Sequence, residues 1–261
     1  MNNALWAAKS GLDAQQSRMA VISNNLANAN TTGFKRDRAV FEDLLYQKVR
    51  QPGGQTAQDA ELPSGLAIGT GVRLAATQKI HSQGGLQITE NALDMAIEGR
   101  GFFEVQMPNG GIGYTRDGSF QLSAEGQMVT ANGYPLTAGI TVPSNATSIT
   151  IGRDGTVSAQ LPGTTALSQL GTIQLADFVN PSGLEPVGTN LFRESPASGA
   201  AIQGVPGQGG IGQVLQGSVE SSNVNIVEEL ISMIETQRAY ELNSKAISTT
   251  DGMLQFANNN I

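Results

Sequence analysis

The chain has 261 residues, a formal net charge of −7 and no cysteine. The acidic balance argues against binding to nucleic acid, which needs a basic stripe on the protein surface, and the lack of cysteine excludes disulfide bonds and cysteine-ligated metals. Only 14% of the residues are charged, compared with roughly 25% in ordinary soluble domains, and this neutral polar composition suits a protein with much of its surface in contacts.

The sequence contains no expected membrane span and no recognisable secretory signal. No run of about 18 apolar residues occurs, so we expect no insertion into a membrane. Lys9, Asp13, Gln15 and Gln16 interrupt the apolar residues near the start, whereas a signal peptide has an unbroken apolar core. If the protein leaves the cytoplasm, we expect it to do so without cleavage of this end.

Residues 3–29 are predicted to form one helix with an apolar residue at every seventh position. Such a repeat keeps one side of a helix facing a partner along a supercoil. Gly11 costs this helix about 1 kcal/mol relative to alanine. The residues expected to make the contact are Leu5, Leu12, Met19, Ile22 and Leu26.

The segment SNNLANANTTGFKR, at residues 23–36, is predicted to end this helix. Asparagine forms helices poorly and tolerates the left-handed conformation, glycine suits a helix C-cap, and the phenylalanine offers an apolar anchor. An ordinary helix terminus rich in Asn and Gly explains the spacing equally well. The residues of this helix-end motif are Asn24, Asn25, Asn28, Asn30, Gly33 and Phe34.

Residues 31–65 are expected to connect the helix to a second domain. The part at 38–51 could be helical or extended. The part that follows is expected to be a loop, because proline and glycine interrupt regular structure. The candidate loop residues are Gln51, Pro52, Gly53, Gly54, Gln55 and Gln58.

Residues 66–223 are predicted to form a compact, antiparallel β-rich domain with its own core. Runs of strand-forming residues occur at 101–107, 113–122, 126–130, 148–152 and 171–178. Asn-Gly and Asp-Gly pairs, which are typical of hairpin turns, begin at Asn109, Asp117, Asn132 and Asp154. The stretch at 194–213 is rich in Gly, Pro and Ser and is expected to be a long loop.

A second helix is predicted at 225–256, with Asn225 as its N-cap. Its apolar arc near the start covers roughly 160°, which is too wide for one partner helix. We therefore expect both helices to be poorly ordered in the free monomer and to complete their burial against neighbouring copies, although docking on the β domain as ordinary amphipathic helices is an alternative. The residues expected to make contact are Ile226, Leu230, Met233, Ile234, Tyr240, Ile247 and Leu254.

Together these elements predict an α+β fold. Two terminal helical segments, at 1–30 and 224–261, are expected to pair as a coiled coil, and the antiparallel β-rich domain lies between them in the sequence. At about 1.5 Å per residue both helices are long enough to run side by side.

No enzymatic site and no cofactor are expected. GQGGIG at 207–212 has the glycine spacing of a dinucleotide site, but that site needs a strand before it and a helix after it. The single histidine, His81, cannot supply a common zinc site without cysteines, and a structural role is expected. Asp117 and Asp154 each precede glycine in a turn, where Asp bonds to the backbone.

Both terminal segments resemble those of the bacterial flagellar rod and hook family. The resemblance rests on residues 23–36 and on SSNVNIVEELISMIETQRAYELNSKAISTTDGML at 221–254, and it extends to 97–105 and 114–136 in the β region. Within the family, LWAAKSGLDAQQ, RAVFEDLLYQKVRQPGGQ, LPSGLAIGTGVR and ITIGRDGTVS are most similar to segments of distal rod members. Hook members are similar but usually longer.

The resemblance implies a structural subunit that polymerises with itself into an open helical tube, the drive shaft that passes motor torque to the hook and filament. It implies export through the flagellar type III apparatus without a cleaved signal, and a place in the basal body across the periplasm. The implied partners are proximal rod proteins, the hook protein or hook junction, and the surrounding P and L rings. The loop at 51–58 is hypothesised to stiffen the shaft. Another axial paralogue, or a secreted β-domain binding module, is the alternative.

Overall fold

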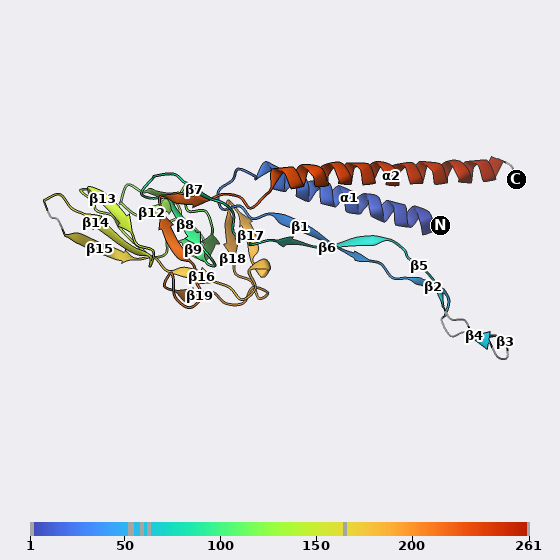
Figure 1. Cartoon of the computed structure of the whole chain (residues 1–261), viewed down its shortest axis with the longest axis horizontal. Helices are drawn as coiled ribbons and strands as arrows, with labels where there is room; N and C mark the ends of the chain where they lie inside the picture. Colours follow the sequence, from blue (N-terminus) through green and yellow to red (C-terminus); the bar gives the residue numbers. More distant parts are fainter. Residues whose placement is uncertain (1–2, 52–54, 58–59, 62–63, 164–165, 260–261) are drawn as a thin grey trace. The chain divides into compact units, whose positions relative to one another are not determined.

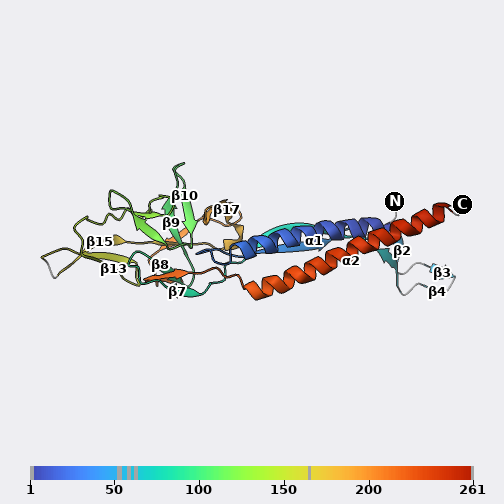
Figure 2. The same cartoon turned by 90° about the horizontal axis from the view of Figure 1, so that it is seen from above.

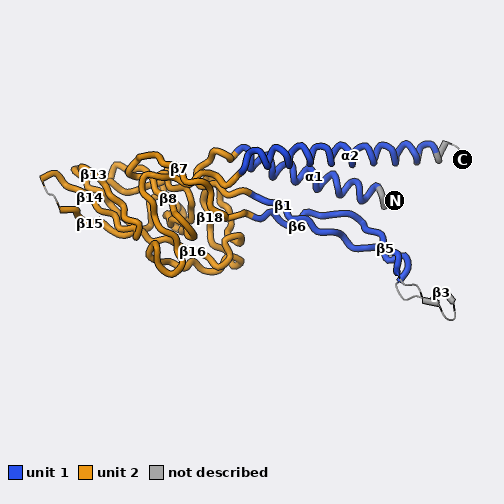
Figure 3. The backbone as a smooth tube through the Cα atoms, in the orientation of Figure 1, with its two compact units in different colours: residues 1–27, 37–78, 225–261 blue, residues 28–36, 79–224 orange. Residues whose placement is uncertain are grey.

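The structure is a computed structural model, and it describes residues 3–51, 55–57, 60–61, 64–163 and 166–259. Over these ranges the chain has a long helix at each end and a β-rich centre (Figure 1). The prediction of two terminal helices and an antiparallel β-rich region between them is confirmed. The chain forms two compact units, which are unit 1 (residues 1–27, 37–78 and 225–261) and unit 2 (residues 28–36 and 79–224) (Figure 3).

Unit 1 contains both helices, α1 (Asn3–Ala27) and α2 (Ile226–Asn259), and they lie side by side (Figure 1, Figure 2). Their bounds are close to the predicted ranges. The predicted N-cap is confirmed, because the side-chain oxygen of Asn225 accepts the backbone N–H of Val227 at 3.1 Å.

The strands of unit 1 form narrow two-stranded pairs, so most of the segment at 38–51 is extended. α1 contacts one of these strands, β1, as well as α2, and the Ser10 hydroxyl oxygen accepts the backbone N–H of Val72 at 3.2 Å. The pairs are β1 (Asp37–Asp43) with β6 (Val72–Lys79), β2 (Gln47–Arg50) with β5 (Leu66–Ile68), and β3 (Gln55–Ala57) with β4 (Ala60–Glu61).

Unit 2 is built on one larger sheet and several smaller ones, in which neighbouring strands run antiparallel. The six-stranded sheet has the order β17 (Glu185–Gly188), β18 (Leu191–Arg193), β10 (Ile112–Thr115), β9 (Phe102–Gln106), β16 (Leu175–Asp177) and β19 (Ile202–Gly204). The three-stranded sheet contains β13 (Ser148–Ile151), β14 (Thr156–Gln160) and β15 (Leu167–Thr172). The remaining pairs are β11 (Phe120–Leu122) with β12 (Met128–Thr130), β8 (Met95–Glu98) with β20 (Gln213–Gln216), and β7 (Leu86–Ile88) with β21 (Ser218–Glu220).

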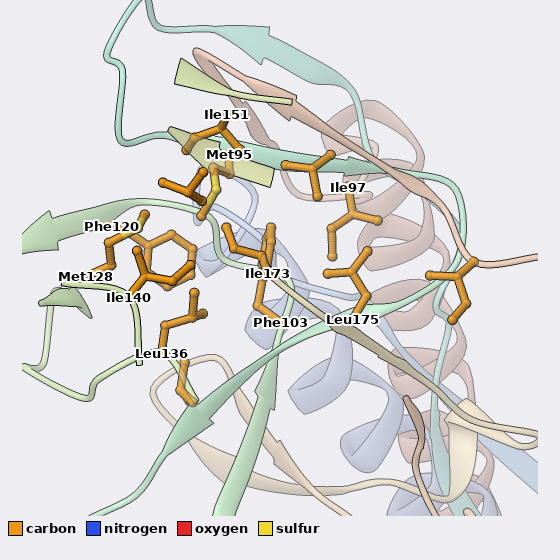
Figure 4. Packing of buried hydrophobic residues seen from close by; sticks show 14 of the residues in the cluster. Met95, Ile97, Phe103, Phe120, Met128, Leu136, Ile140, Ile151, Ile173 and Leu175 are labelled. Carbon is orange, nitrogen blue, oxygen red and sulfur yellow. The ribbon is translucent and has the colours of Figure 1, made fainter. Parts of the chain in front are cut away.

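Strand β9 separates two hydrophobic clusters, because successive side chains of a strand point to opposite faces. Phe103 belongs to the main core of unit 2, whereas Phe102 packs with Phe178 and Phe192 in a second cluster. Side chains from different sheets converge in the main core, so it holds the small sheets together as one body (Figure 4). The labelled residues of that core are Met95, Ile97, Phe103, Phe120, Met128, Leu136, Ile140, Ile151, Ile173 and Leu175.

Three of the four predicted hairpin turns are confirmed and one is wrong. The turn at 132–133 is confirmed because Val129 and Pro135, on either side of it, pair antiparallel. The turns at 109–110 and 154–155 join antiparallel neighbours, with both glycines at φ 79°. The turn at 117–118 does not, since β10 and β11 belong to different sheets. A Cβ at Gly118 would lie 1.5 Å from the carbonyl oxygen of Met95, so glycine here allows a close backbone approach that carries the chain to another sheet.

The compact units divide the chain at different places from the segments expected from the sequence. Residues 28–36 belong to the β-rich unit, where the backbone N–H of Gly33 donates to the carbonyl oxygen of Glu220 at 2.7 Å. Residues 66–78 belong to unit 1, because β6 pairs with β1. The stretch at 194–213 is not a loop throughout, since β19 lies within it and pairs with β16.

Candidate functional site

The two terminal helices of unit 1 run antiparallel in close contact. The Asn25 amide near the end of α1 donates to Oε1 of Glu229 near the start of α2 at 3.2 Å. Gly11, earlier in α1, lies against Asn243, later in α2, and a Cβ on that glycine would be 3.1 Å from Asn243 Nδ2. The start of one helix therefore lies beside the end of the other, as in an antiparallel pair.

The predicted contact residues of α1 are at least partly covered. Ile22 is buried, and Leu5, Leu12, Met19 and Leu26 are half-buried. Both α2 and β1 contact α1 within the unit and contribute to this coverage.

The predicted contact residues of α2 lie mostly on its exposed side. Ile226, Leu230, Ile234 and Tyr240 are between 41% and 51% exposed. Met233 and Ile247 are half-buried, and the side chain of Leu254 is outside the described residues. On the side of α2 that faces α1, the buried residues are instead polar, namely Glu229 and Thr236.

The exposed apolar residues of α2 form a surface that we call the outer face. The side chains of Val227, Ile231 and Leu242 are 64%, 53% and 69% exposed, and they add to those already named. A group of apolar residues on a helix that a single chain leaves uncovered is typical of a protein–protein contact. The outer face consists of Ile226, Val227, Leu230, Ile231, Ile234, Tyr240 and Leu242.

The helix-end motif is split between the two units. In unit 1, Asn25 is buried and ties α1 to β1, because its Oδ1 accepts the backbone N–H of Asp37 at 2.8 Å and its Nδ2 donates to the Asp37 carbonyl at 2.9 Å. Asn24 is exposed, and its amide lies 3.5 Å from the Asp37 carboxylate.

The later residues of the motif belong to unit 2. Asn28 accepts a backbone hydrogen bond from Thr31 at 3.2 Å, and Asn30 is exposed. Gly33 lies beyond the helix end, at φ 67°, where a Cβ would come within 2.4 Å of the Asp117 backbone nitrogen. The Phe34 ring lies under the Lys79 ammonium group, 5.1 Å from its centroid.

Directly after the motif, Lys35 enters a buried ion cluster of unit 2 with Arg116 and Glu220. Lys35 Nζ is 2.5 Å from Glu220 Oε1, and Arg116 Nη1 is 3.1 Å from Glu220 Oε2. All three side chains are buried. We refer to these three residues as the charge cluster.

Backbone groups supply further hydrogen bonds to the charge cluster, while Arg116 Nε is buried without a hydrogen-bond partner. Lys35 Nζ donates to the Ser82 carbonyl at 2.8 Å, Arg116 Nη2 donates to the Gly99 carbonyl at 2.6 Å, and the Gly84 N–H donates to Glu220 Oε1 at 2.8 Å. Such bonds are needed, because an ion pair offsets the cost of burial only when its other polar atoms are satisfied.

Burial sets the direction of the pKa shifts around the cluster. It lowers the pKa of Lys35 and that of Arg116, while the Glu220 carboxylate opposes both shifts. Burial, with the nearby charges of Lys35 and Arg116, also lowers the pKa of His81 to about 4. The His81 ring packs edge-on against Phe102, so it serves the second hydrophobic cluster.

Sequence reasoning did not identify the charge cluster. Lys35 and Glu220 are 185 positions apart, and no local pattern joins them. The sequence around each residue is polar, as in TTGFKRDR around Lys35, so it carries no signal that the charge is buried.

Of the candidate loop, Pro52, Gly53, Gly54 and Gln58 lie outside the described residues. Gln51 is exposed, and Gln55 begins β3, where it pairs with Glu61.

The residues weighed for enzymatic chemistry have structural roles. Asp154 accepts the backbone N–H and hydroxyl of Thr156 at 3.1 and 2.8 Å, and Asp117 bonds Ser119 in the same way. The glycines at 207–212 precede strand β20, whereas a dinucleotide fingerprint precedes a helix. Among the described residues, no cluster of three or more His, Asp or Glu side chains could hold a metal, and no helix is long and apolar enough to span a membrane.

Comparison with known proteins agrees with this arrangement. Residues 5–35 match the family described as "Flagella basal body rod protein", residues 96–159 match "Flagellar hook protein FlgE/F/G D1 domain", and residues 215–260 match "Flagellar basal body rod FlgEFG protein C-terminal". The chain is 56% identical over 252 residues, 97% of each chain, to flagellar basal-body rod protein FlgG of Buchnera aphidicola from Acyrthosiphon pisum. The chain belongs to the flagellar basal-body rod protein family.

More distant rod proteins of this name match over almost the whole chain as well. FlgG of Borreliella burgdorferi is 46% identical over 99% of this chain and 98% of its own length, and FlgG of Bacillus subtilis is 38% identical over 98% and 97%. The resemblance stated from the sequence is thereby confirmed. The flagellar rod and hook family is structural, so the expectation that the chain is not an enzyme holds as well.

Proposed function

We propose that the chain is a subunit of the distal part of the flagellar basal-body rod and polymerises into a helical tube that acts as a drive shaft. The observation that carries this proposal is the outer face of α2, an apolar surface that a single copy leaves exposed. Family membership supplies the assembly in which such a face would be covered.

The occupant of the outer face is a second copy of this chain. The α1–α2 pair, as a coiled coil, would pack beside the pairs of neighbouring copies, and the half-buried predicted contacts of α1 would complete their burial there. A contact that uses different surfaces on the two copies and does not close into a ring produces an open helical filament. Burial of the outer face would then accompany incorporation, which couples the stability of the helices to assembly.

The drive shaft would lie in the basal body and cross the periplasm, where it passes torque from the motor to the hook and filament. Its subunits would leave the cell through the flagellar type III export apparatus without cleavage of a signal peptide. Proximal rod proteins would precede it, the hook protein or a hook junction would follow it, and the P and L rings would surround it. The family matches support this placement, since they span rod and hook proteins.

Electron microscopy of basal bodies tests the proposal. A strain that lacks the gene should produce truncated rods without hooks or filaments. Complementation with Ile234→Asp, which places a charge on the outer face, should leave the same truncated rods. Glu235→Lys, which changes the charge at an exposed residue on another side of α2, should restore motility. Normal flagella in the deletion strain, or in the Ile234→Asp strain, would refute the proposed role.

The loop at 51–58 is proposed to tune contacts between copies and to make the shaft stiff. The side chains of the neighbouring strand β2 are exposed along its whole length, so another copy could contact them. Deletion of the loop should give rods with altered bending under the electron microscope, and an unchanged straight shaft would contradict this role.

A further inference from the structure

The contact between α1 and α2 is polar where a helix pair is ordinarily apolar. The buried residues on the inner side of α2 are Glu229 and Thr236, and Asn243 follows after another seven residues, opposite Gly11. Of the hydrophobic side chains of the same helix, Met233 and Ile247 are only half-buried and most others lie on the outer face. The hydrophobic effect therefore contributes less to this contact than the length of the helices suggests.

Asn25 is the most constrained residue of this polar contact. Its side chain is 1% exposed and makes three hydrogen bonds, two to the backbone of Asp37 and one to Glu229. Glu229 is itself 8% exposed. A buried amide and a buried carboxylate that satisfy each other are costly to separate, because each would remain desolvated without its partner.

A second contact gives the same alignment of the helices further along. Gly11 and Asn25 are 14 residues apart on α1, and their partners Asn243 and Glu229 are also 14 residues apart on α2. The space beside Gly11 accommodates the Asn243 amide, since a Cβ there would approach Nδ2 to 3.1 Å. The energetic cost of a glycine within a helix thus has a packing reason at this position.

We infer that Asn25 and Glu229, with the Gly11–Asn243 contact, set the register of α1 against α2. A seven-residue repeat by itself permits slippage by whole heptads, and a buried polar pair is a known means of allowing only one register at some cost in stability. A slip of seven residues in one direction places Asn25 opposite Thr236 and Arg18 opposite Asn243. It then leaves the Glu229 carboxylate without its amide partner and puts a long side chain where glycine now allows close contact.

The consequence for assembly, which rests on the proposed function, concerns the outer face. Residues of α2 keep fixed positions relative to α1 only when the register is unique. Every copy would then present the outer face at the same height, as a regular helical lattice requires. Asn25 and Glu229 are in this sense positioning residues for the subunit contact, although neither belongs to the outer face.

Disulfide trapping tests the register directly, because the natural chain contains no cysteine. In the observed alignment Gln15 lies opposite Ala239, whereas slips by one heptad bring it opposite Ala246 or Ser232. Three variants of the full-length chain would each carry Gln15→Cys with Ala239→Cys, Ala246→Cys or Ser232→Cys. After mild oxidation, the first pair should cross-link within the chain at least about tenfold more than the other two, as expected when a charged hydrogen bond separates the registers.

The same three pairs are then compared in backgrounds that alter the polar contact. Glu229→Leu should raise the two slipped cross-links toward the level of the aligned one, and Glu229→Gln, which keeps an acceptor for Asn25, should restore the preference for the aligned pair. Glu228→Leu, the exposed neighbour, is the matched control and should change nothing. A single aligned cross-link that persists in Glu229→Leu would overturn the inference, and so would the loss of all three cross-links in that variant, since the glutamate would then maintain pairing rather than register.

The trapping experiment does not depend on the rod assignment. If the purified chain cross-links as expected but the gene deletion leaves normal flagella, the register inference stands and the proposed function fails. If the rods are truncated in the deletion strain but the aligned and slipped pairs cross-link equally in purified chain and in isolated basal bodies, the proposed function stands and the inference fails.

Discussion

Replacement of Glu220 by glutamine is the sharpest perturbation of unit 2. The two carboxylate oxygens of Glu220 face donors, since Lys35 and the Gly84 N–H bond to Oε1 and Arg116 bonds to Oε2. Glutamine has nearly the same shape but only one acceptor oxygen. Its NH₂ group would therefore face a donor in either orientation, and two cations would remain buried without an anion.

The size of the effect follows from the burial of the pair. Removal of one partner of a buried ion pair costs about 3–5 kcal/mol, and both Lys35 and Glu220 have side chains with 0% exposure. For a denaturant dependence of about 2.5 kcal/mol per molar urea, the midpoint of unit 2 should fall by about 1–2 M. That is a large part of the roughly 5–15 kcal/mol that stabilises a typical domain.

Urea unfolding, monitored by hydrogen exchange of the backbone amides in strands β8 and β21, measures this loss of stability within unit 2. The matched control is Glu185→Gln, because Glu185 also pairs with an arginine, Arg193, at 2.7 Å, but both side chains are about half exposed. An exposed pair contributes less than about 1 kcal/mol, so the control should shift the midpoint by less than about 0.4 M. Equal midpoints for the two variants would refute the argument that the buried carboxylate holds unit 2 together.

Three further substitutions test the pKa shifts and the backbone geometry of unit 2. The pKa of His81 is lowered from 6.5 to about 4, so the unfolded chain binds a proton at His81 before the folded chain does when the pH falls. Between these pH values the wild type should lose about 3 kcal/mol of stability, and His81→Leu should not. Urea midpoints measured across that pH range would show the difference. Burial raises the pKa of Glu104, so the folded chain keeps this proton to a higher pH than the unfolded chain. The wild type should therefore lose stability from about pH 4.5 to neutrality, and Glu104→Gln should not. An unchanged pH profile of stability in the variant would contradict this. Gly33→Ala should be more destabilising than Gly163→Ala in thermal unfolding. Both glycines have positive φ, which costs alanine about 1–2 kcal/mol, but only at Gly33 does backbone lie within 2.4 Å of the new Cβ. Equal losses of stability would exclude the close approach as a cause.

The heptad pattern predicted the terminal helices well but could not say which side of α2 faces α1. Two series repeat every seven residues along that helix, the apolar one that begins at Ile226 and the polar one of Glu229, Thr236 and Asn243. Hydrophobicity favoured the first series as the inner one. In the structure Glu229 and Thr236 of the polar series are buried, whereas Met233 and Ile247 of the apolar series are only half-buried. Asn25 of α1 offers Glu229 a specific partner, and such a match depends on the approach of two distant segments.

The same limit applies to the β-rich unit. The turn residues alone predicted the structure correctly where a turn joins two strands that pair with each other, as at 109–110. It failed at 117–118, where the direction of the chain is set by contact with a strand from elsewhere in the unit. Lys35, Arg116 and Glu220 could not have been grouped from the sequence, since the chain entropy of bringing them together is overcome only by the packing of the whole unit.

The two units differ in how much of their apolar surface and buried charge is covered or paired within one copy of the chain. This difference has a thermodynamic consequence. Unit 2 buries its aromatic side chains and pairs its buried charges within one chain, so its unfolding should not depend on protein concentration. In unit 1, α2 leaves Val227, Ile231 and Leu242 more than half exposed, and only a second molecule can remove that surface from water. Because a partner that binds the folded state stabilises it by mass action, the helices should gain stability with increasing concentration while unit 2 does not. A chain divided in this way can fold its β-rich unit first and defer the burial of its helices until it meets another copy.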